Sequence, residues 1–126
     1  MRKKVIKNII RVNIMKKQNN AAEKSESKFC FHEGLKLQRS GLIKEAIEYY
    51  KKSLRLDPDN FDANNIFGII EINKNNYNQA IKYLNKALQI NNKSSHALNN
   101  LGIAFYKIKK ISEAIDCYKK SINIGI

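Results

Sequence analysis

The stretch Gly41–Leu54 reads GLIKEAIEYYKKSL, and its pattern returns twice at intervals of 34 residues, over Asn75–Leu88 and over Lys109–Ile122. The same interval separates three alanines within these stretches: Ala46, Ala80 and Ala114. It also separates three glycines that lie upstream of them: Gly34, Gly68 and Gly102. A fixed period of this length predicts a repeat architecture. The apolar spacing within each copy predicts an amphipathic helix.

Each repeat is predicted to hold two helices of roughly 13 residues joined by a short turn. A glycine inside a helix costs about 1 kcal/mol relative to alanine, so three glycines in register need a compensating gain. We expect that gain to be close approach of the second helix, helped by its own alanine. Asp57-Pro58-Asp59-Asn60 is predicted to end the first repeat, because proline cannot continue a helix and Asp and Asn favour turns.

The chain resembles the tetratricopeptide repeat, a 34-residue helix-turn-helix unit. Small residues stand at the family's eighth, twentieth and twenty-seventh positions: Gly34, Ala46, Ser53; Gly68, Ala80, Ala87; Gly102, Ala114, Ser121. The large residue of its twenty-fourth position is Tyr50, Leu84 and Tyr118. The resemblance implies an all-α fold, a right-handed superhelical array (α-solenoid) of antiparallel helix pairs. The three repeats would be residues 27–60, 61–94 and 95–126, after an N-terminal segment and linker over residues 1–26.

Some positions depart from the family pattern. The aromatic fourth position holds Cys30, Asn64 and Leu98. The seventh position holds Glu33 in the first repeat, and the eleventh holds Glu71 in the second. These departures predict looser packing of the first helix in repeats 1 and 2 than in repeat 3.

The chain carries 24 Lys and Arg against 11 Asp and Glu, but 20 of the cations are Lys. Abundant Lys, Asn and Ile indicate a general drift in composition, and a nucleic-acid binder would gather Arg and aromatic residues on one face. Cys30 and Cys117 lie far apart without metal-ligand or redox spacing, so we expect reduced thiols in a reducing compartment, the cytoplasm. No apolar run approaches the ~20 residues of a membrane-spanning helix.

Residues 1–18 contain no acidic residue and predict an amphipathic basic helix. Its apolar side gathers Val5, Ile6, Ile9, Ile10 and Val12, opposite Lys4, Lys7 and Arg11. Three interpretations stay open: an extra helix packed on the first repeat or a frayed appendage, a helix on an anionic membrane surface, or an organelle transit segment. The last would make the location organellar. Gln18–Ser27 is polar and small, and is predicted to be a linker or a poorly formed turn.

The resemblance implies a concave groove, lined by the first helix of each pair, that receives a peptide or a helix. The candidate groove residues are Phe31, Leu35, Asn65, Ile69, His96, Asn99, Ile103, Tyr106 and Lys107. One version of the family clamps the carboxylates of a peptide's C-terminus, but the matching positions here hold Phe31, Leu35, Ile66 and Asn100, so we expect no such clamp. Asn65 and Asn99 either bond a peptide backbone or solvate an exposed face.

Catalysis has little support in the sequence. His32 and His96 are the only histidines, and His96 has no acidic residue three or four positions away. No glycine-rich phosphate loop is present, since none of the five glycines stands in a GxxxxGK arrangement. The sequence therefore predicts no catalytic residue, no metal site and no cofactor.

The function predicted is that of a non-enzymatic scaffold or adaptor that binds a peptide or helix of a partner protein, with Lys residues favouring an acidic partner. An alternative is the substrate-presenting region of a larger enzyme, such as a protein O-glycosyltransferase. A weaker alternative is binding of RNA or an anionic membrane through residues 2–17. An uncapped last repeat would expose Ile122, Ile124 and Ile126, which predicts self-association or a partner that covers them.

Overall fold

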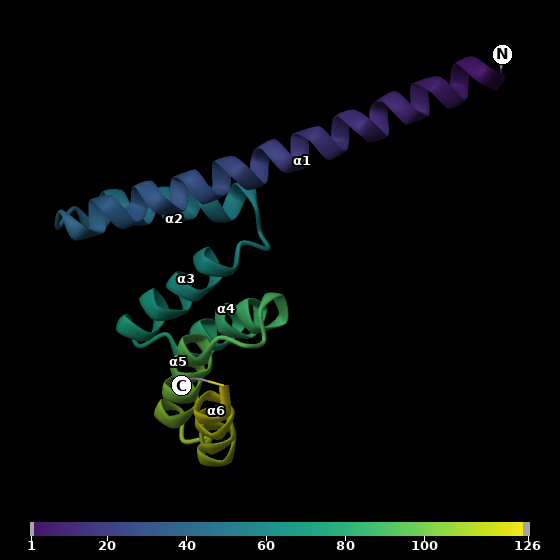
Figure 1. Ribbon diagram of the computed structural model, residues 1–126. Helices are drawn as coiled ribbons and strands as arrows, with labels where there is room; N and C mark the ends of the chain where they lie inside the picture. Colours follow the sequence, from purple (N-terminus) through teal and green to yellow (C-terminus); the bar gives the residue numbers. More distant parts are fainter. Residues whose placement is uncertain (1, 125–126) are drawn as a thin grey trace.

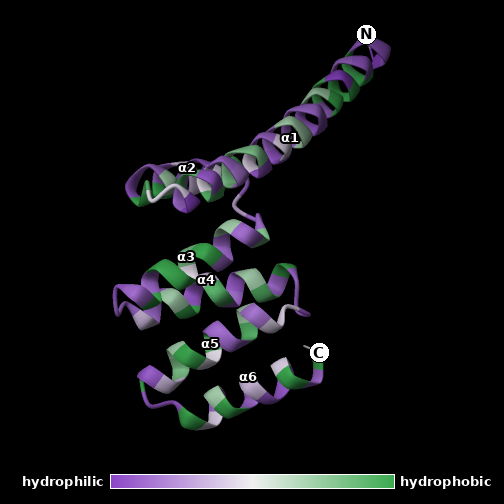
Figure 2. Cartoon of the chain, turned by 60° about the vertical axis from the view of Figure 1, so that its left-hand side comes forward, coloured by the Kyte–Doolittle hydropathy of each residue, from purple (hydrophilic) through white to green (hydrophobic). Residues whose placement is uncertain are grey.

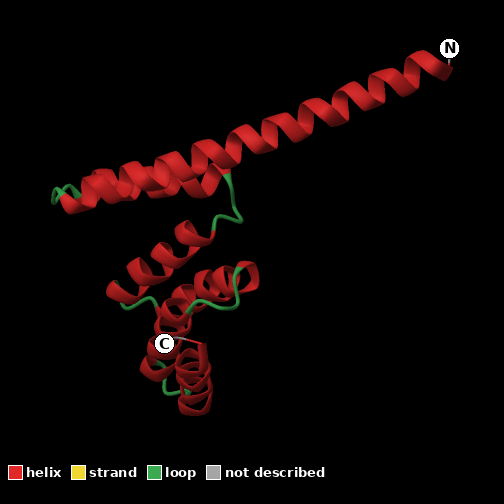
Figure 3. Cartoon of the chain, viewed as in Figure 1, coloured by secondary structure: helices red, strands yellow, loops and turns green. Residues whose placement is uncertain are grey.

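Six helices joined by short loops make up residues 2–124, the part of the chain that the computed structural model describes (Figures 1 and 3). They are α1 (Arg2–Arg39), α2 (Ile43–Leu56), α3 (Phe61–Asn73), α4 (Tyr77–Ile90), α5 (Ser95–Lys107) and α6 (Ile111–Ile124). The last third of α1 pairs with α2, α3 pairs with α4, and α5 pairs with α6. These pairs stack one after another, as Figure 2 shows, which confirms the predicted all-α array. The position of Ile126 lies outside the described residues.

The turn inside each helix pair repeats its backbone conformation. The residue two positions before each second helix begins has positive φ: 83° for Gly41, 63° for Asn75 and 65° for Lys109. Glycine adopts this left-handed region freely and asparagine tolerates it, whereas a side chain such as that of Lys109 adds strain. The 34-residue period is thus visible in the backbone as well as in the side chains.

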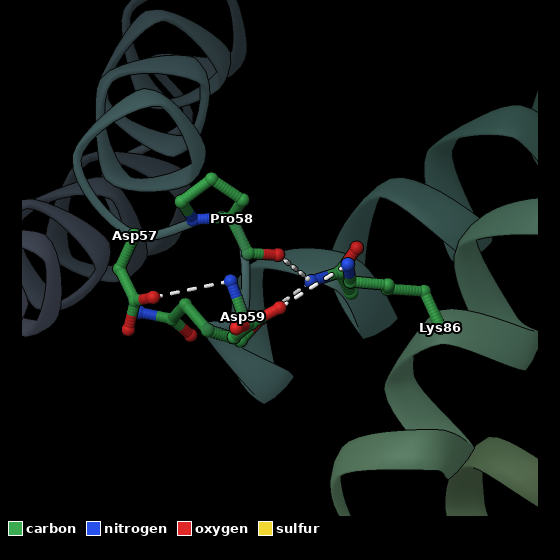
Figure 4. A network of polar contacts seen from close by, with 6 residues as sticks. Asp57, Pro58, Asp59 and Lys86 are labelled. Atoms are coloured by element: carbon green, nitrogen blue, oxygen red, sulfur yellow. Dashed lines mark hydrogen bonds and ion pairs between the residues drawn. The ribbon is translucent and has the colours of Figure 1, made fainter.

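The turn between α2 and α3 follows the predicted Pro58 stop. Asp57 is extended, with φ −143°, as expected for a residue that precedes a proline. Its carboxylate accepts a bond from the backbone N–H of Asp59 at 3.1 Å, and the Asp59 carboxylate lies 3.1 Å from Lys86 Nζ of α4 (Figure 4). Because both partners of this ion pair are largely exposed, we expect it to contribute at most about 1 kcal/mol.

A buried hydroxyl cluster joins α1 to α2. Ser27 Oγ donates to the Ser53 carbonyl at 2.7 Å, and Ser53 Oγ donates to the Ser27 carbonyl at 2.8 Å. Asn60 Nδ2 reaches Ser27 Oγ at 2.9 Å, while its Oδ1 caps the N-terminus of α3. The same place in repeat 3 has a single bond, from Ser121 Oγ to the Ser95 carbonyl at 3.1 Å. The cluster fixes where α1 becomes part of the array.

The three in-register glycines lie where the second helix of each pair comes closest. A methyl group added to each would approach within 2.5 or 2.6 Å of the facing side chain, which is Tyr50 for Gly34, Leu84 for Gly68 and Tyr118 for Gly102. No real Cβ tolerates such a distance without displacing its neighbour. The predicted role of these glycines in close helix approach is confirmed.

Residues 2–26 of α1 extend beyond the first repeat as a free helix (Figure 1). The predicted linker over Gln18–Ser27 is wrong: the helix runs through it, because this stretch lacks Gly and Pro and contains strong helix formers. Of the interpretations left open for residues 1–18, the structure contradicts packing of the apolar side on the first repeat, since Val5 is 57% exposed and Ile9 is 55% exposed. Among the described helices, none is long and apolar enough to cross a membrane.

The two junctions between successive helix pairs are not packed equally. One core cluster surrounds Tyr50 and Phe67 at the junction of repeats 1 and 2, and another surrounds Leu84 and Leu101 at the junction of repeats 2 and 3. Helix α2 contacts α3 less extensively than α4 contacts α5. The looser packing predicted for the first helices of repeats 1 and 2 is wrong within the helix pairs, since α1 contacts α2 more extensively than α5 contacts α6, and α3 contacts α4 about as extensively. The weaker contact is the junction of α2 with α3, which two clefts flank.

Candidate functional site

The predicted groove residues of the third repeat share one exposed face of α5. They are His96, Asn99, Ile103, Tyr106 and Lys107. Their spacing of three or four residues, with one adjacent pair at the end, keeps them on one side of the helix. Tyr106 is 59% exposed and Ile103 is 38% exposed, so a ligand could contact apolar surface on this face without any movement of the helices.

The predicted groove residues of the first two repeats are more covered. Phe31 is only 8% exposed, and its ring lies 5.3 Å from that of Tyr50 inside the core. The structure therefore places Phe31 in the core rather than on the groove surface. Leu35 and Ile69 are half-buried, and Leu35 packs against the same core cluster.

A small cleft, here called the inner cleft, lies between repeat 1 and α3. It measures about 210 Å³ and brings Ile66, Ile69 and Asn73 of α3 against Gln38 and Tyr50 of repeat 1. Most of its lining is apolar, with the amides of Gln38 and Asn73 as polar groups. It is smaller than the roughly 300–1,000 Å³ of most small-molecule pockets, so its size suits one inserted side chain.

Tyr50 connects the inner cleft to the core. Its hydroxyl donates to Gln38 Oε1. Burial raises the pKa of Tyr50 above its ordinary value, and the nearby positive charge of Arg39 opposes this rise. The phenol is therefore held protonated as a donor, which orients the Gln38 amide beside the cleft.

Asn65 differs from the other polar groove residues. Its Oδ1 is the one buried side-chain oxygen or nitrogen in residues 2–124 that has no hydrogen-bond partner. A buried acceptor left unpaired costs about 1–3 kcal/mol. Asn99, one repeat later, is exposed. The structure thus brings Asn65 and Asn99 onto the first helices of neighbouring repeats, but in different environments.

The described histidines and cysteines do not gather into a metal-binding group. Within residues 2–124, no group of three or more His, Cys, Asp or Glu side chains could hold a metal ion. His32 and His96 are both exposed. Cys30 and Cys117 are free and buried, and burial raises the pKa of the Cys117 thiol, with Lys120 opposing the shift and Asp116 adding to it. A thiol with a raised pKa is a weak nucleophile at neutral pH.

The sequence did not identify the residues that line the clefts between repeats. Ile47 and Ile70 line both clefts, and Tyr50 lines the inner one. The one available signal was Glu71, which stands where repeats 1 and 3 have Leu37 and Phe105.

Comparison with protein families gives two matches to models of the tetratricopeptide repeat, over residues 59–125 and over residues 27–60. Comparison with curated proteins gives no match.

Three solved structures are similar in fold. The second tetratricopeptide region of Spaghetti (RPAP3), bound to the HSP90 peptide SRMEEVD, has a TM-score of 0.75 at 18% identity and covers 85% of this chain and 98% of its own. The first such region of the same protein, bound to the same peptide, has a TM-score of 0.72 at 22% identity and covers 81% of each chain. PilF of Pseudomonas aeruginosa has a TM-score of 0.68 at 25% identity and covers 80% of this chain and 46% of its own.

Proposed function

This chain belongs to the tetratricopeptide repeat family, and we propose that it is a non-enzymatic adaptor that binds a peptide segment of a partner protein along α1, α3 and α5. The observation that carries the proposal is the exposed face of α5, on which Tyr106 and Ile103, two of the predicted groove residues, lie uncovered. Two structures of similar fold hold a peptide, which supports the same use of the fold here.

The groove would act through shape and apolar contact. Tyr106 supplies a large ring with a polar tip, a combination enriched at interfaces. The inner cleft accepts one apolar side chain, and the amides of Asn99 and Gln38 bond the peptide backbone. Lys107 on the same face of α5 attracts an acidic partner.

Binding by this chain should not depend on the terminal carboxylate of a peptide. At the positions of the family's carboxylate clamp the chain has Phe31, Leu35, Ile66 and Asn100, none of which is charged. Phe31 is also buried. We therefore expect the peptide SRMEEVD to bind no better than its C-terminally amidated form.

A random peptide library displayed on phage tests the groove. The intact protein is the bait, Tyr106→Ala is the test variant, and Tyr49→Ala is the matched control because Tyr49 is an exposed tyrosine on α2, outside the groove. Peptides selected by the intact protein should be lost with Tyr106→Ala and kept with Tyr49→Ala. Equal recovery with both variants would remove the groove from the proposal.

A second candidate function belongs to residues 2–17 of α1. Here we propose association with an anionic membrane surface, because the apolar side of this helix is fully available and basic residues flank it. The exposed apolar side favours a membrane over RNA, because binding to RNA phosphates would require only the basic residues of this helix.

Vesicles with and without anionic lipid test this second function. Binding should require anionic lipid, fall with salt, and be weakened by Ile9→Asn on the apolar side. Ile14→Asn is the matched control, since Ile14 lies on the other side of the helix and is similarly exposed, at 49% against 55% for Ile9. Binding of RNA that both variants leave unchanged would favour the nucleic-acid alternative instead.

Helix α6 carries an apolar stripe that supports self-association. Ile111, Ile115 and Ile122 are 47%, 47% and 65% exposed and lie on one face. The residues one repeat earlier, such as Ile81 and Leu88, pack against the core at the junction of repeats 2 and 3. We propose that a second copy or a partner covers the stripe. Sedimentation should show a dimer that Ile122→Asp dissociates, and a monomer at every concentration would refute self-association.

A further inference from the structure

A second and larger cleft, here called the outer cleft, lies on the other flank of the α2–α3 contact. It measures about 410 Å³ and is bounded by α2, α3 and Tyr83 of α4. Its apolar part includes Phe67 and Tyr83, whose rings stack with centroids 5.4 Å apart. Ile47 and Ile70 line both this cleft and the inner cleft, and so form the wall between the two.

At the outer cleft the chain has an acidic residue where the next junction has an aromatic one. Thirty-four residues after Glu71, at the same place in the next junction, Phe105 packs against the cluster of Leu84 and Leu101. Glu71 instead accepts a hydrogen bond from Asn76 Nδ2 at 2.9 Å. Its carboxylate is held towards the turn after α3, so position 71 adds no apolar side chain to the space that the outer cleft occupies.

The rim of the outer cleft is cationic, and the matching rim one junction later is neutral. Lys51, Arg55 and Lys74 line the cleft. The residues 34 positions later are Asn85, Gln89 and Ile108. The molecule thus contains the same junction twice, once with Phe105 and a neutral rim, and once with Glu71, a cleft and a cationic rim. Because the fold forms without these cations at the second junction, packing does not require them at the first.

The local acidic groups do not neutralise this rim. Lys51 pairs with Glu48 at 3.2 Å, but both side chains are more than half exposed, so the pair contributes little. Glu71 is the one acidic residue in the lining, against three cations. An apolar floor with an excess of positive charge around it selects an apolar side chain flanked by negative charge.

The geometry points to a second binding site in the outer cleft, for an acidic segment of a partner protein. One large apolar side chain of that segment rests on Phe67 and Tyr83, and its neighbouring Asp or Glu residues contact Lys51, Arg55 and Lys74. The site is separate from the groove of α1, α3 and α5, so it does not depend on the function proposed above. A partner that bound both the groove and the outer cleft would contact the array on both sides of the α2–α3 contact.

The test uses the full chain and the same phage-displayed peptide library, with counter-selection on two variants. Glu71→Phe fills the cleft with the residue that the next junction uses, and it also removes a negative charge. The double variant Lys51→Asn with Arg55→Gln gives the rim the neutral residues of that junction. Lys119→Asn is the matched control, because Lys119 is an exposed lysine at the position equivalent to Lys51 in the last repeat.

The expected result is a set of peptides, rich in Asp and Glu around an aromatic residue or Leu, that bind the intact protein and the Lys119→Asn control. Both test variants should weaken them about tenfold or more, the size of effect seen when an anchor contact is lost. Since Glu71→Phe makes the rim more positive, weaker binding by that variant cannot come from a loss of charge attraction and indicates that the cleft has been filled. Unchanged far-ultraviolet circular dichroism and thermal midpoint establish that each variant is folded.

Three results would overturn the site. The first is a selection in which every peptide binds the Glu71→Phe variant as well as the intact protein. The second is that the peptides lost with Glu71→Phe contain no Asp or Glu. The third is displacement of the peptides by inorganic phosphate at equal concentration, which would mean that any anion can bind the cationic rim. Tyr106→Ala is included in every selection. Peptides lost with Tyr106→Ala but kept with Glu71→Phe belong to the groove, so failure of one site is distinguished from failure of the other.

Discussion

Replacing the in-register glycines with alanine should have unequal effects, although the three positions are equivalent in the repeat. At Gly34 the new Cβ would lie 2.5 Å from Tyr50 Cε1 and 3.2 Å from the carbonyl oxygen of Ala46. Tyr50 is 1% exposed and its hydroxyl is bonded to Gln38, so the ring has nowhere to move. At Gly102 the Cβ would lie 2.6 Å from Tyr118 Cε1, but that ring is partly exposed and can turn outward.

The size of the difference follows from two opposing terms. Overpacking a rigid site costs about 1–3 kcal/mol, whereas alanine in place of glycine inside a helix gains about 1 kcal/mol. For Gly34→Ala the clash with Tyr50 and with backbone should dominate, which leaves a net loss of about 1–2 kcal/mol. For Gly102→Ala the two terms should nearly cancel, because Tyr118 yields at low cost.

Urea denaturation followed by circular dichroism at 222 nm provides the measurement, with the midpoint compared at unchanged slope. Gly34→Ala should shift the midpoint clearly downward and Gly102→Ala should leave it almost unchanged. An equal loss for the two variants, or a larger loss for Gly102→Ala, would refute the argument that the freedom of the facing tyrosine decides the cost.

Three further outcomes are expected. Lys109→Gly should raise the free energy of unfolding, measured in thermal melts, by up to about 1 kcal/mol, because Lys109 has positive φ. Asn75→Gly should raise it less, and no gain for Lys109→Gly would contradict backbone strain at Lys109. Burial raises the pKa of Tyr50 above 10.0, so the contribution of its protonated phenol to the free energy of unfolding is complete below about pH 10 and is lost as the pH rises further. The free energy of unfolding should therefore fall less steeply above about pH 10 in Tyr50→Phe than in the intact protein, and equal slopes of the two curves would contradict this. Ser53→Ala should lower the urea midpoint more than Ser121→Ala, since Ser53 belongs to the buried hydroxyl cluster and Ser121 makes one bond.

The repeat pattern was sufficient for most of the array. The positions of Gly34, Gly68 and Gly102 predicted close helix contact, and the Pro58 turn predicted the end of repeat 1. Both depend on the backbone and on residues within one repeat. Local chemistry of this kind can be inferred from spacing, because a helix fixes which side chains share a face.

Features that depend on more than one local signal were predicted less well. Phe31 was assigned to the groove, yet with Ser27, Cys30 and Gly34 it forms a buried stripe at spacings of three and four residues, the pattern of a core-facing side. Residues 18–26 were expected to be a linker because they are polar, but polar residues without Gly or Pro are compatible with a solvent-exposed helix.

The clefts are a different case, because they require two repeats to be docked before they exist. Glu71 signalled that the first helix of repeat 2 would pack poorly. The sequence did not show that the resulting space would stay open between Phe67 and Tyr83, since that depends on the relative placement of three helices. Volume between elements is decided by tertiary packing, which a periodic pattern describes only indirectly.

The continuous helix α1 also has a mechanical consequence. At 1.5 Å per residue, the part of α1 from Arg2 to Ser27 spans about 38 Å, and Ser27 is its first buried residue. A helix without a break transmits rotation as well as distance, so whatever holds its far end sets the direction in which the groove faces. The free part of α1 is therefore a stiff spacer of defined reach, and ligands bound at its two ends would be held a fixed distance apart.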